Sequence, residues 1–144
     1  DYPEAEDELT LVRLNTQEQS NEQNVANLTP ILNSQLIEDI RRLATRTDVD
    51  PLLYQYALDI VRATRTYPGV LHGAGVRGSI NLIKAAKVTA IMDGRNYLTP
   101  DDIKSNAMPG LRHRMVLSAE LELEGVSADQ VVLRVLESVD APRQ

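Results

Sequence analysis

The residues best suited to chemistry lie in a short glycine-containing segment in the middle of the chain. Gly73, Gly75 and Gly78 permit tight turns and close backbone approach, and Arg77 lies among them at the start of a predicted helix. The exposed N–H groups of a helix start, with a guanidinium beside them, offer charge and directed donors to a phosphate. Arg77 is therefore the candidate contact for an anion, with the three glycines as candidate backbone contacts. The alternative is an ordinary surface arginine, which the residues alone favour.

Other kinds of catalytic or metal site lack the residues that they need. No Walker-type glycine loop ending in Lys and Ser or Thr is found, so this segment is not expected to hold or hydrolyse a nucleotide unaided. His72 and His113 are far apart and have no acid at helical ligand spacing, which argues against a zinc site and predicts surface or capping roles. A serine nucleophile elbow is also missing. Asp101 and Asp102 are explained by the first turn of a predicted helix, where acids stabilise the dipole.

Composition favours one helical domain without membrane insertion. The 144 residues include 42% hydrophobic residues but only five aromatic ones, all Tyr, so aliphatic side chains must fill the core. No apolar run approaches the roughly 20 residues that span a bilayer, and the acidic start is unlike a signal peptide. Cysteine is absent, which excludes disulfides and fits a cytoplasmic protein. Because there is no initiator Met, we expect an excised piece of a longer protein.

Charge is distributed unevenly along the chain. The net charge is −6, which argues against a general nucleic-acid binder. Residues 60–114 contain nine Lys or Arg and three Asp, which gives +6 and leaves −12 for the rest of the chain. A local positive field in an acidic protein suggests a confined anion; the alternative is a solvated face balanced by the flanking acids.

Helical patterns frame the glycine segment. Residues 4–14 predict a first helix, residues 15–28 a polar linker, and Leu36, Ile40 and Leu43 form the stripe of a second helix. We therefore divide the chain into a first helix and polar linker at 1–28 and a helical domain at 29–144. Asp50 and Pro51 predict the start of the next helix, which ends near Tyr67. Its predicted buried face consists of Leu53, Ala57, Ile60, Val61 and Thr64.

The second half of the chain adds three helices and an ambiguous segment. Residues 68–78 are predicted as a loop, followed by a helix that Gly94 caps. Thr99 starts the next helix, and Ser127 with Gln130 forms a capping box for the last. Alternation over residues 115–124 has the period of a strand. The prediction is an all-α bundle of about six helices, with one short strand near 115–123 as an option.

Three stretches in order resemble the C-terminal lid of MoxR-family AAA+ ATPases, relatives of the magnesium-chelatase ATPase subunit. They are residues 58–65, which end in Thr and Arg; residues 73–77; and residues 94–114, from Gly-Arg-Asn-Tyr through Leu-Thr-Pro-Asp-Asp to Arg-His-Arg. Residues 73–77 read Gly-Ala-Gly-Val-Arg, similar to the family's Gly-Ala-Ser-Pro-Arg, with Gly75 and Val76 in place of Ser and Pro. This departure predicts a more mobile loop. The resemblance covers about half of the chain, from 58 to 125.

The resemblance implies a helical lid at 29–144 and a sensor 2 role for Arg77, which would reach the terminal phosphates of ATP. It also implies a parent enzyme that hydrolyses ATP with Mg²⁺, both bound by an N-terminal P-loop domain of the same chain. MoxR-like proteins resemble bacterial chaperone-like remodellers that form hexameric rings, so the expected partners are neighbouring ring subunits and von Willebrand factor A domain proteins. Arg112, His113 and Arg114 are interface candidates or parts of a packed hinge, and Arg95 is expected to contact carbonyls of the preceding helix.

Two other functions are compatible with the residues. A stand-alone helical interaction module would bind a partner protein without any dependence on nucleotide. A nucleic-acid site in the basic centre would show steep salt dependence, but the acidic total and the lack of clustered aromatics disfavour it.

Overall fold

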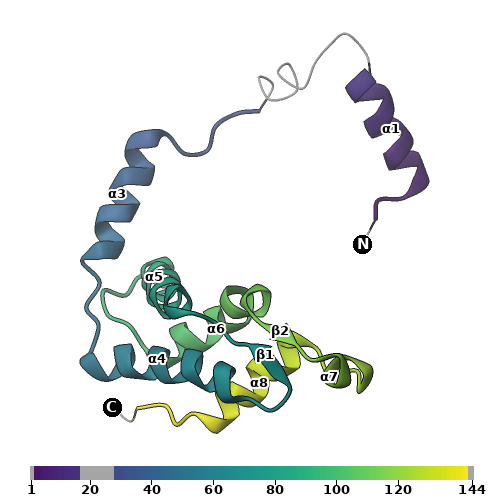
Figure 1. Cartoon of the computed structure of the whole chain (residues 1–144). Coiled ribbons are helices and arrows are strands. Elements are labelled where there is room, and N and C mark those ends of the chain that lie inside the picture. Colours follow the sequence, from purple (N-terminus) through teal and green to yellow (C-terminus); the bar gives the residue numbers. More distant parts are fainter. Residues whose placement is uncertain (1, 17–27, 143–144) are drawn as a thin grey trace. The chain divides into compact units, whose positions relative to one another are not determined.

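The computed structural model describes residues 2–16 and 28–142, and in these ranges the chain is mostly helical (Figure 1). They contain seven α-helices and one two-stranded antiparallel sheet, which confirms the all-α prediction. The helix beyond the predicted six is α7 (Ala119–Leu123). None of the helices in the described ranges combines the length and apolar character needed to cross a bilayer.

Contacts divide the chain into two units, Asp1–Glu38 and Asp39–Gln144, with the boundary inside helix α3 (Ser34–Thr45). Helix α1 (Ala5–Thr16) lies in the first unit and buries none of its residues. Both helices were predicted, and most of the predicted linker at 15–28 lies outside the described residues. The stripe of Leu36, Ile40 and Leu43 remains at least 36% exposed, so α3 is amphipathic without burying its apolar face.

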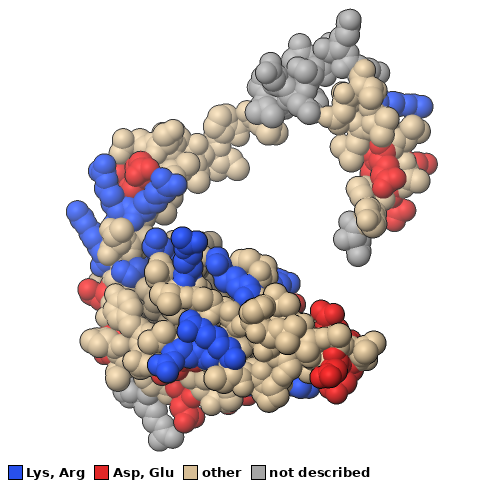
Figure 2. Space-filling model, in the orientation of Figure 1, with Lys and Arg blue, Asp and Glu red and all other residues tan. Residues whose placement is uncertain are grey.

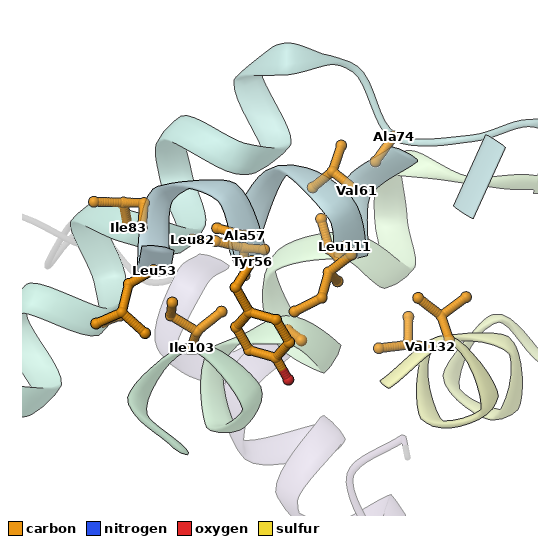
Figure 3. Close-up of a cluster of buried hydrophobic side chains, with 14 of the residues drawn as sticks. Leu53, Tyr56, Ala57, Val61, Ala74, Leu82, Ile83, Ile103, Leu111 and Val132 are labelled. Atoms are coloured by element: carbon orange, nitrogen blue, oxygen red, sulfur yellow. The ribbon is translucent and has the colours of Figure 1, made fainter. Parts of the chain in front are cut away.

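Helix α4 (Pro51–Thr66) is central to the hydrophobic core. Asp50 caps it by accepting a hydrogen bond from the Leu52 amide at 2.8 Å, and Pro51 occupies the first helical position, as predicted. Its buried side chains are the predicted five with Tyr56 in addition. All of them except Thr64 belong to the apolar cluster, and Figure 3 labels Leu53, Tyr56, Ala57 and Val61.

Three further helices surround α4 through apolar faces. Helix α5 (Val76–Met92) packs on α4 and α6 (Pro100–Leu111), and α8 (Ala128–Ser138) packs on α4 and α6. Leu82 and Ile83 of α5, Ile103 and Leu111 of α6, and Val132 of α8 meet the α4 residues in Figure 3. Each buried aliphatic side chain contributes roughly 1.5–3 kcal/mol relative to exposure, so this cluster provides most of the stabilisation.

A small sheet closes one end of this unit. Strand β1 (Val70–His72) pairs antiparallel with β2 (Val116–Leu117), with Val70 opposite Leu117. The strand expected near 115–123 is confirmed at these two residues. After them Ser118 caps α7 by accepting a hydrogen bond from the Leu121 amide, and the chain becomes helical. The partner strand β1 lies within the segment predicted as a loop; a 3-10 turn, η1 (Arg112–Arg114), precedes β2.

The connection between α5 and α6 is held by an ion pair between a partly exposed arginine and a buried carboxylate. Gly94 ends α5 with φ +74, as its predicted capping role requires. The Arg95 guanidinium donates to both carboxylate oxygens of Asp102, at 2.8 and 2.7 Å, and to Asp93 at 2.9 Å. Asp102 also accepts from the amide and hydroxyl of Thr99, so it completes the capping box of α6. Arg95 was predicted to contact carbonyls of α5, and its backbone amide does so by donating to the Ala90 carbonyl at 2.8 Å. Its side chain binds Asp102, which was not predicted, because the buried carboxylate offers a charged, bidentate partner.

Removing this carboxylate should destabilise the fold. We expect Asp102→Asn to lower the free energy of unfolding by about 2 kcal/mol at neutral pH, because Arg95 loses a buried charged partner. Arg95 holds the pKa of Asp102 below its ordinary value. The stabilisation is therefore complete above the unfolded pKa of about 4 and is lost as the pH falls through the folded value.

Urea unfolding at a series of pH values measures this effect. The difference between the wild-type chain and Asp102→Asn should be constant near neutrality and shrink in acid. Asp101→Asn is the matched control, since the Asp101 side chain is 88% exposed and its ion pair with Lys104 should contribute no more than about 1 kcal/mol. Equal losses in the two variants would contradict the assigned role of Asp102.

Candidate functional site

Arg77 lies in the first turn of α5 with an exposed side chain. Gly75 is the N-cap residue, in extended conformation with φ −81 and ψ 178, and it supplies no side-chain cap. Within the ranges 2–16 and 28–142, the Arg77 side chain makes no hydrogen bond or ion pair. The charge of Arg77 is thus available to a ligand at the positive end of a 17-residue helix.

The loop before Arg77 is fixed to the end of α4 through one buried residue, Ala74. The Ala74 amide donates to Thr64 Oγ1 at 3.0 Å, and the Ala74 carbonyl accepts from Arg65 Nε at 2.8 Å. Thr64 Oγ1 in turn donates to the Val61 carbonyl at 2.6 Å, which orients the hydroxyl so that a lone pair is free for Ala74. Ala74 and Thr64 are both fully buried. Two consecutive side chains of a core helix therefore hold both polar groups of one loop residue.

The three glycines of the segment have different environments. A Cβ on Gly73 would lie 2.6 Å from the N and Cα atoms of Arg65, so the loop can approach α4 this closely only with glycine there. A Cβ on Gly78 would lie 3.2–3.3 Å from Leu111 and Ala74, a tight contact between packed elements. Nothing lies within 4 Å of a Cβ built on Gly75. Gly73 and Gly78 thus have packing roles, which leaves their predicted contacts with a cofactor as proposals.

An apolar groove lies beside α5 in the second unit. Its volume is about 700 Å³, and residues of α5, α4 and the end of α3 line it, among them Ile40, Tyr54, Ile80, Ile83 and Val88. Arg41, Lys84 and Lys87 also line it. Arg77, Ile80 and Lys84 follow one another at helical spacing, so the groove continues the face of α5 that carries Arg77. Figure 2 shows Lys and Arg gathered where α5 lies and Asp and Glu gathered at α7.

The other candidate residues have local structural contacts. His72 and His113 are exposed, as predicted, and Arg112 pairs with Asp129 at 3.3 Å. Arg114 donates to the Gly110 carbonyl at 3.0 Å, which supports a packed turn rather than a free basic surface. Among the described residues, no group of three or more His, Cys, Asp or Glu is arranged to hold a metal ion.

A fixed loop with an exposed arginine at the following helix start agrees with the resemblance to the lid of MoxR-family ATPases. Comparison with known families shows to which family the chain belongs. The sequence model of the AAA lid domain matches residues 62–135, about half of the chain. This chain belongs to the AAA lid domain family. The match includes the Thr64–Arg65 end of α4, the glycine loop, Arg77 and most of α8.

Several relatives share this lid. The chain is 34% identical to YeaC of Bacillus subtilis over 143 residues, which is 99% of the chain and 43% of YeaC. It is 31% identical to the chaperone MoxR1 of Mycobacterium tuberculosis over 113 residues, or 72% of the chain and 30% of MoxR1. A crystal structure of a protein from Cytophaga hutchinsonii, provisionally described as an ATPase, aligns with a TM-score of 0.75 at 30% identity and covers 99% of the chain and 45% of that protein. The chain spans less than half the length of these relatives.

Sequence reasoning located the loop of the lid but not the contacts that hold it. Thr64 was predicted only as part of a buried face, and Arg65 only as part of a family motif. The signal that could have revealed them was a polar, buried threonine followed by arginine at the end of a helix and just before a glycine-containing turn. Such a pair can satisfy the backbone groups of a loop that returns over the helix end.

The glycine environments predict different effects of alanine at Gly73 and at Gly75 on the free energy of unfolding. Gly73→Ala should lower the free energy of unfolding by about 2 kcal/mol, because the new methyl group overlaps the α4 backbone. Gly75→Ala should change it by less than about 1 kcal/mol, since the site is open and the restriction of the unfolded chain by alanine offsets the poorer N-cap that alanine makes. Chemical unfolding of the 144-residue chain compares the two, and equal effects would argue against the close approach at Gly73.

Proposed function

We propose that this lid domain is the sensor 2 element of a MoxR-type AAA+ ATPase, in which Arg77 contacts the terminal phosphates of ATP. The ATP is bound by a P-loop domain elsewhere in the parent protein. Hydrolysis breaks the bond between the terminal phosphoryl group and ADP and transfers that group to water, and Arg77 would offset the negative charge on it. The lid then couples the nucleotide state to a change in its own angle against that domain.

The observation that carries this proposal is the state of Arg77. An exposed guanidinium without a partner in the described chain, at the start of a helix, has the charge and the donors that a phosphate requires. Comparable arginine contacts on transferring phosphoryl groups contribute several kcal/mol to transition-state stabilisation. The match to the AAA lid domain family and the likeness to the chaperone MoxR1 support this proposal.

The rest of the α5 face suits contact with another domain. Ile80 is 48% exposed and Val88 is 38% exposed, and both line the groove beside Lys84 and Lys87. An apolar surface with a basic border is typical of an interface. We assign it to the P-loop domain, whose nucleotide must approach the same helix if Arg77 reaches it.

We assign Mg²⁺ to the phosphates of the ATP in the P-loop domain, by analogy with the related ATPases. By analogy with MoxR-like remodellers, the parent protein would form a hexameric ring in the bacterial cytoplasm, act on other proteins and work with von Willebrand factor A domain partners. Gly73, Gly75 and Gly78 would bring the backbone of the loop near the nucleotide.

The role of Arg77 is tested by substitution in the full-length ATPase. Arg77→Ala should lower ATP turnover tenfold or more, a loss of about 1.4 kcal/mol of transition-state stabilisation. Arg62→Ala is the matched control, because Arg62 is also exposed and its side chain makes no hydrogen bond or ion pair with the described residues, but it lies within α4 rather than at a helix start. Steady-state turnover at saturating ATP is the measurement. Unchanged turnover in Arg77→Ala would refute the sensor role.

A further inference from the structure

We propose that Thr64 and Arg65 are positioning residues that set where Arg77 points, an inference that rests on the proposed function. Neither side chain needs to touch the nucleotide. They act through the peptide of Ala74, which lies three residues before Arg77. The proposed role therefore belongs to the end of α4, and it involves no new ligand site.

The first step of the argument is that Ala74 is attached on both sides. Its amide and its carbonyl are bound by adjacent residues of α4, at 3.0 and 2.8 Å. A buried residue whose amide and carbonyl are both satisfied has little freedom to shift, because a displacement leaves a donor or an acceptor unpaired. The position of Ala74 is therefore determined by α4.

The second step connects Ala74 to Arg77. Gly75 follows with extended backbone, and its carbonyl accepts from the Gly78 amide at 2.8 Å, closing the first turn of α5. The Cβ of Ala74 lies 3.3 Å from the position of a Cβ on Gly78, so the loop packs directly against that turn. Arg77 lies between Ala74 and Gly78 in the chain. The position of its backbone therefore depends on the contacts that Thr64 and Arg65 make with Ala74.

The third step explains why this attachment is needed. A Cβ on Gly75 would have no neighbour within 4 Å, and Gly75 supplies no side-chain cap, so side chains of the loop do little to define the start of α5. An error of about 1 Å in the placement of a group that contacts a reacting phosphate can reduce the rate roughly a hundredfold. The two hydrogen bonds to Ala74 therefore fix the position of the start of α5, which Gly75 and Val76 do not.

A double-substitution cycle in the full-length ATPase tests this role. Thr64→Val removes the hydroxyl at nearly constant volume and should lower turnover about fivefold, while Thr64→Ser, which keeps the hydroxyl, should restore most of it. The Thr64→Val change should have no further effect when Arg77 is already alanine, because Thr64 acts only through Arg77. A purely structural role would lower turnover by the same factor in both backgrounds.

Two additional variants protect the test from effects on folding. Thr66→Val is the matched control: Thr66 is on the same helix and bonds the carbonyl three residues before it, at 3.4 Å, but does not contact Ala74. It should leave turnover unchanged. Arg65→Ala removes the other hydrogen bond from an exposed residue, so it threatens the core less, and it should show the same dependence on Arg77. Thermal unfolding of every variant confirms that turnover is measured on folded protein.

The outcomes separate the two proposals. Lowered turnover in Arg77→Ala, Thr64→Val and Arg65→Ala, without further loss when either of the last two is combined with Arg77→Ala, supports the positioning role. Lowered turnover in Arg77→Ala with wild-type turnover in Thr64→Val and Arg65→Ala overturns the positioning role alone. Multiplying losses in the combined variants also overturn it. Wild-type turnover in Arg77→Ala removes the sensor 2 function and, with it, this inference.

Discussion

The attachment of the Ala74 peptide to the end of α4 is the constraint on which the arrangement of this lid depends. Thr64 contributes a hydroxyl that is fully buried and already committed to the Val61 carbonyl, so its remaining lone pair has a defined direction. A loop residue that meets this lone pair and the Arg65 guanidinium can be buried without unsatisfied polar groups. The chain can then leave the end of α4, form β1 and return over the same helix end.

Close packing of small residues follows from this return. Gly73 lies against the α4 backbone, and Gly78 allows α5 to approach Leu111 of α6. Small side chains also allow close packing along the helices, where Ala57, Ala86, Ala90 and Ala107 are fully buried. Because few aromatic residues are present to fill space, the interior is built from aliphatic contacts between closely spaced helices. A fixed α5 start is therefore a consequence of both the hydrogen bonds and the packing.

Local signals predicted much of this fold, and non-local ones could not be seen in the sequence. Asp50, Thr99 and Ser127 cap helices as predicted, because a cap is decided by the residue and its next three neighbours. The pairing of β1 with β2 joins segments more than 40 residues apart, and short strands of two or three residues carry little periodicity. Gly73 and Gly75 look alike in the sequence, but only Gly73 lies against the α4 backbone, where a side chain would overlap it. The predicted contact of Arg95 with α5 is present through its backbone amide, but its ion pair was not predicted for the same reason, since the partner Asp102 belongs to the next helix.

The distribution of ion pairs bears on why one arginine of the basic segment is singled out. Within residues 60–114 the three acids are already engaged: Asp93 and Asp102 bind Arg95, and Asp101 binds Lys104. Among the described residues, the ion pair between a cation of this segment and a flanking acid is that of Arg112 with Asp129. The hypothesis that flanking acids neutralise the whole segment is therefore weakly supported by the contacts.

The arginines of this segment also differ in what their side chains already bind. Arg65 and Arg114 donate to backbone carbonyls and Arg95 to buried carboxylate, so their directions are set by the fold. Arg62 and Arg77 have no such contact in the described chain, but Arg62 is in the interior of a helix, where the backbone N–H groups are used. Arg77 alone of these two combines an unused guanidinium with the unpaired amides and positive dipole of a helix start. An anion would therefore gain more at Arg77 than at Arg62, and the contacts of Ala74 hold that advantage in place.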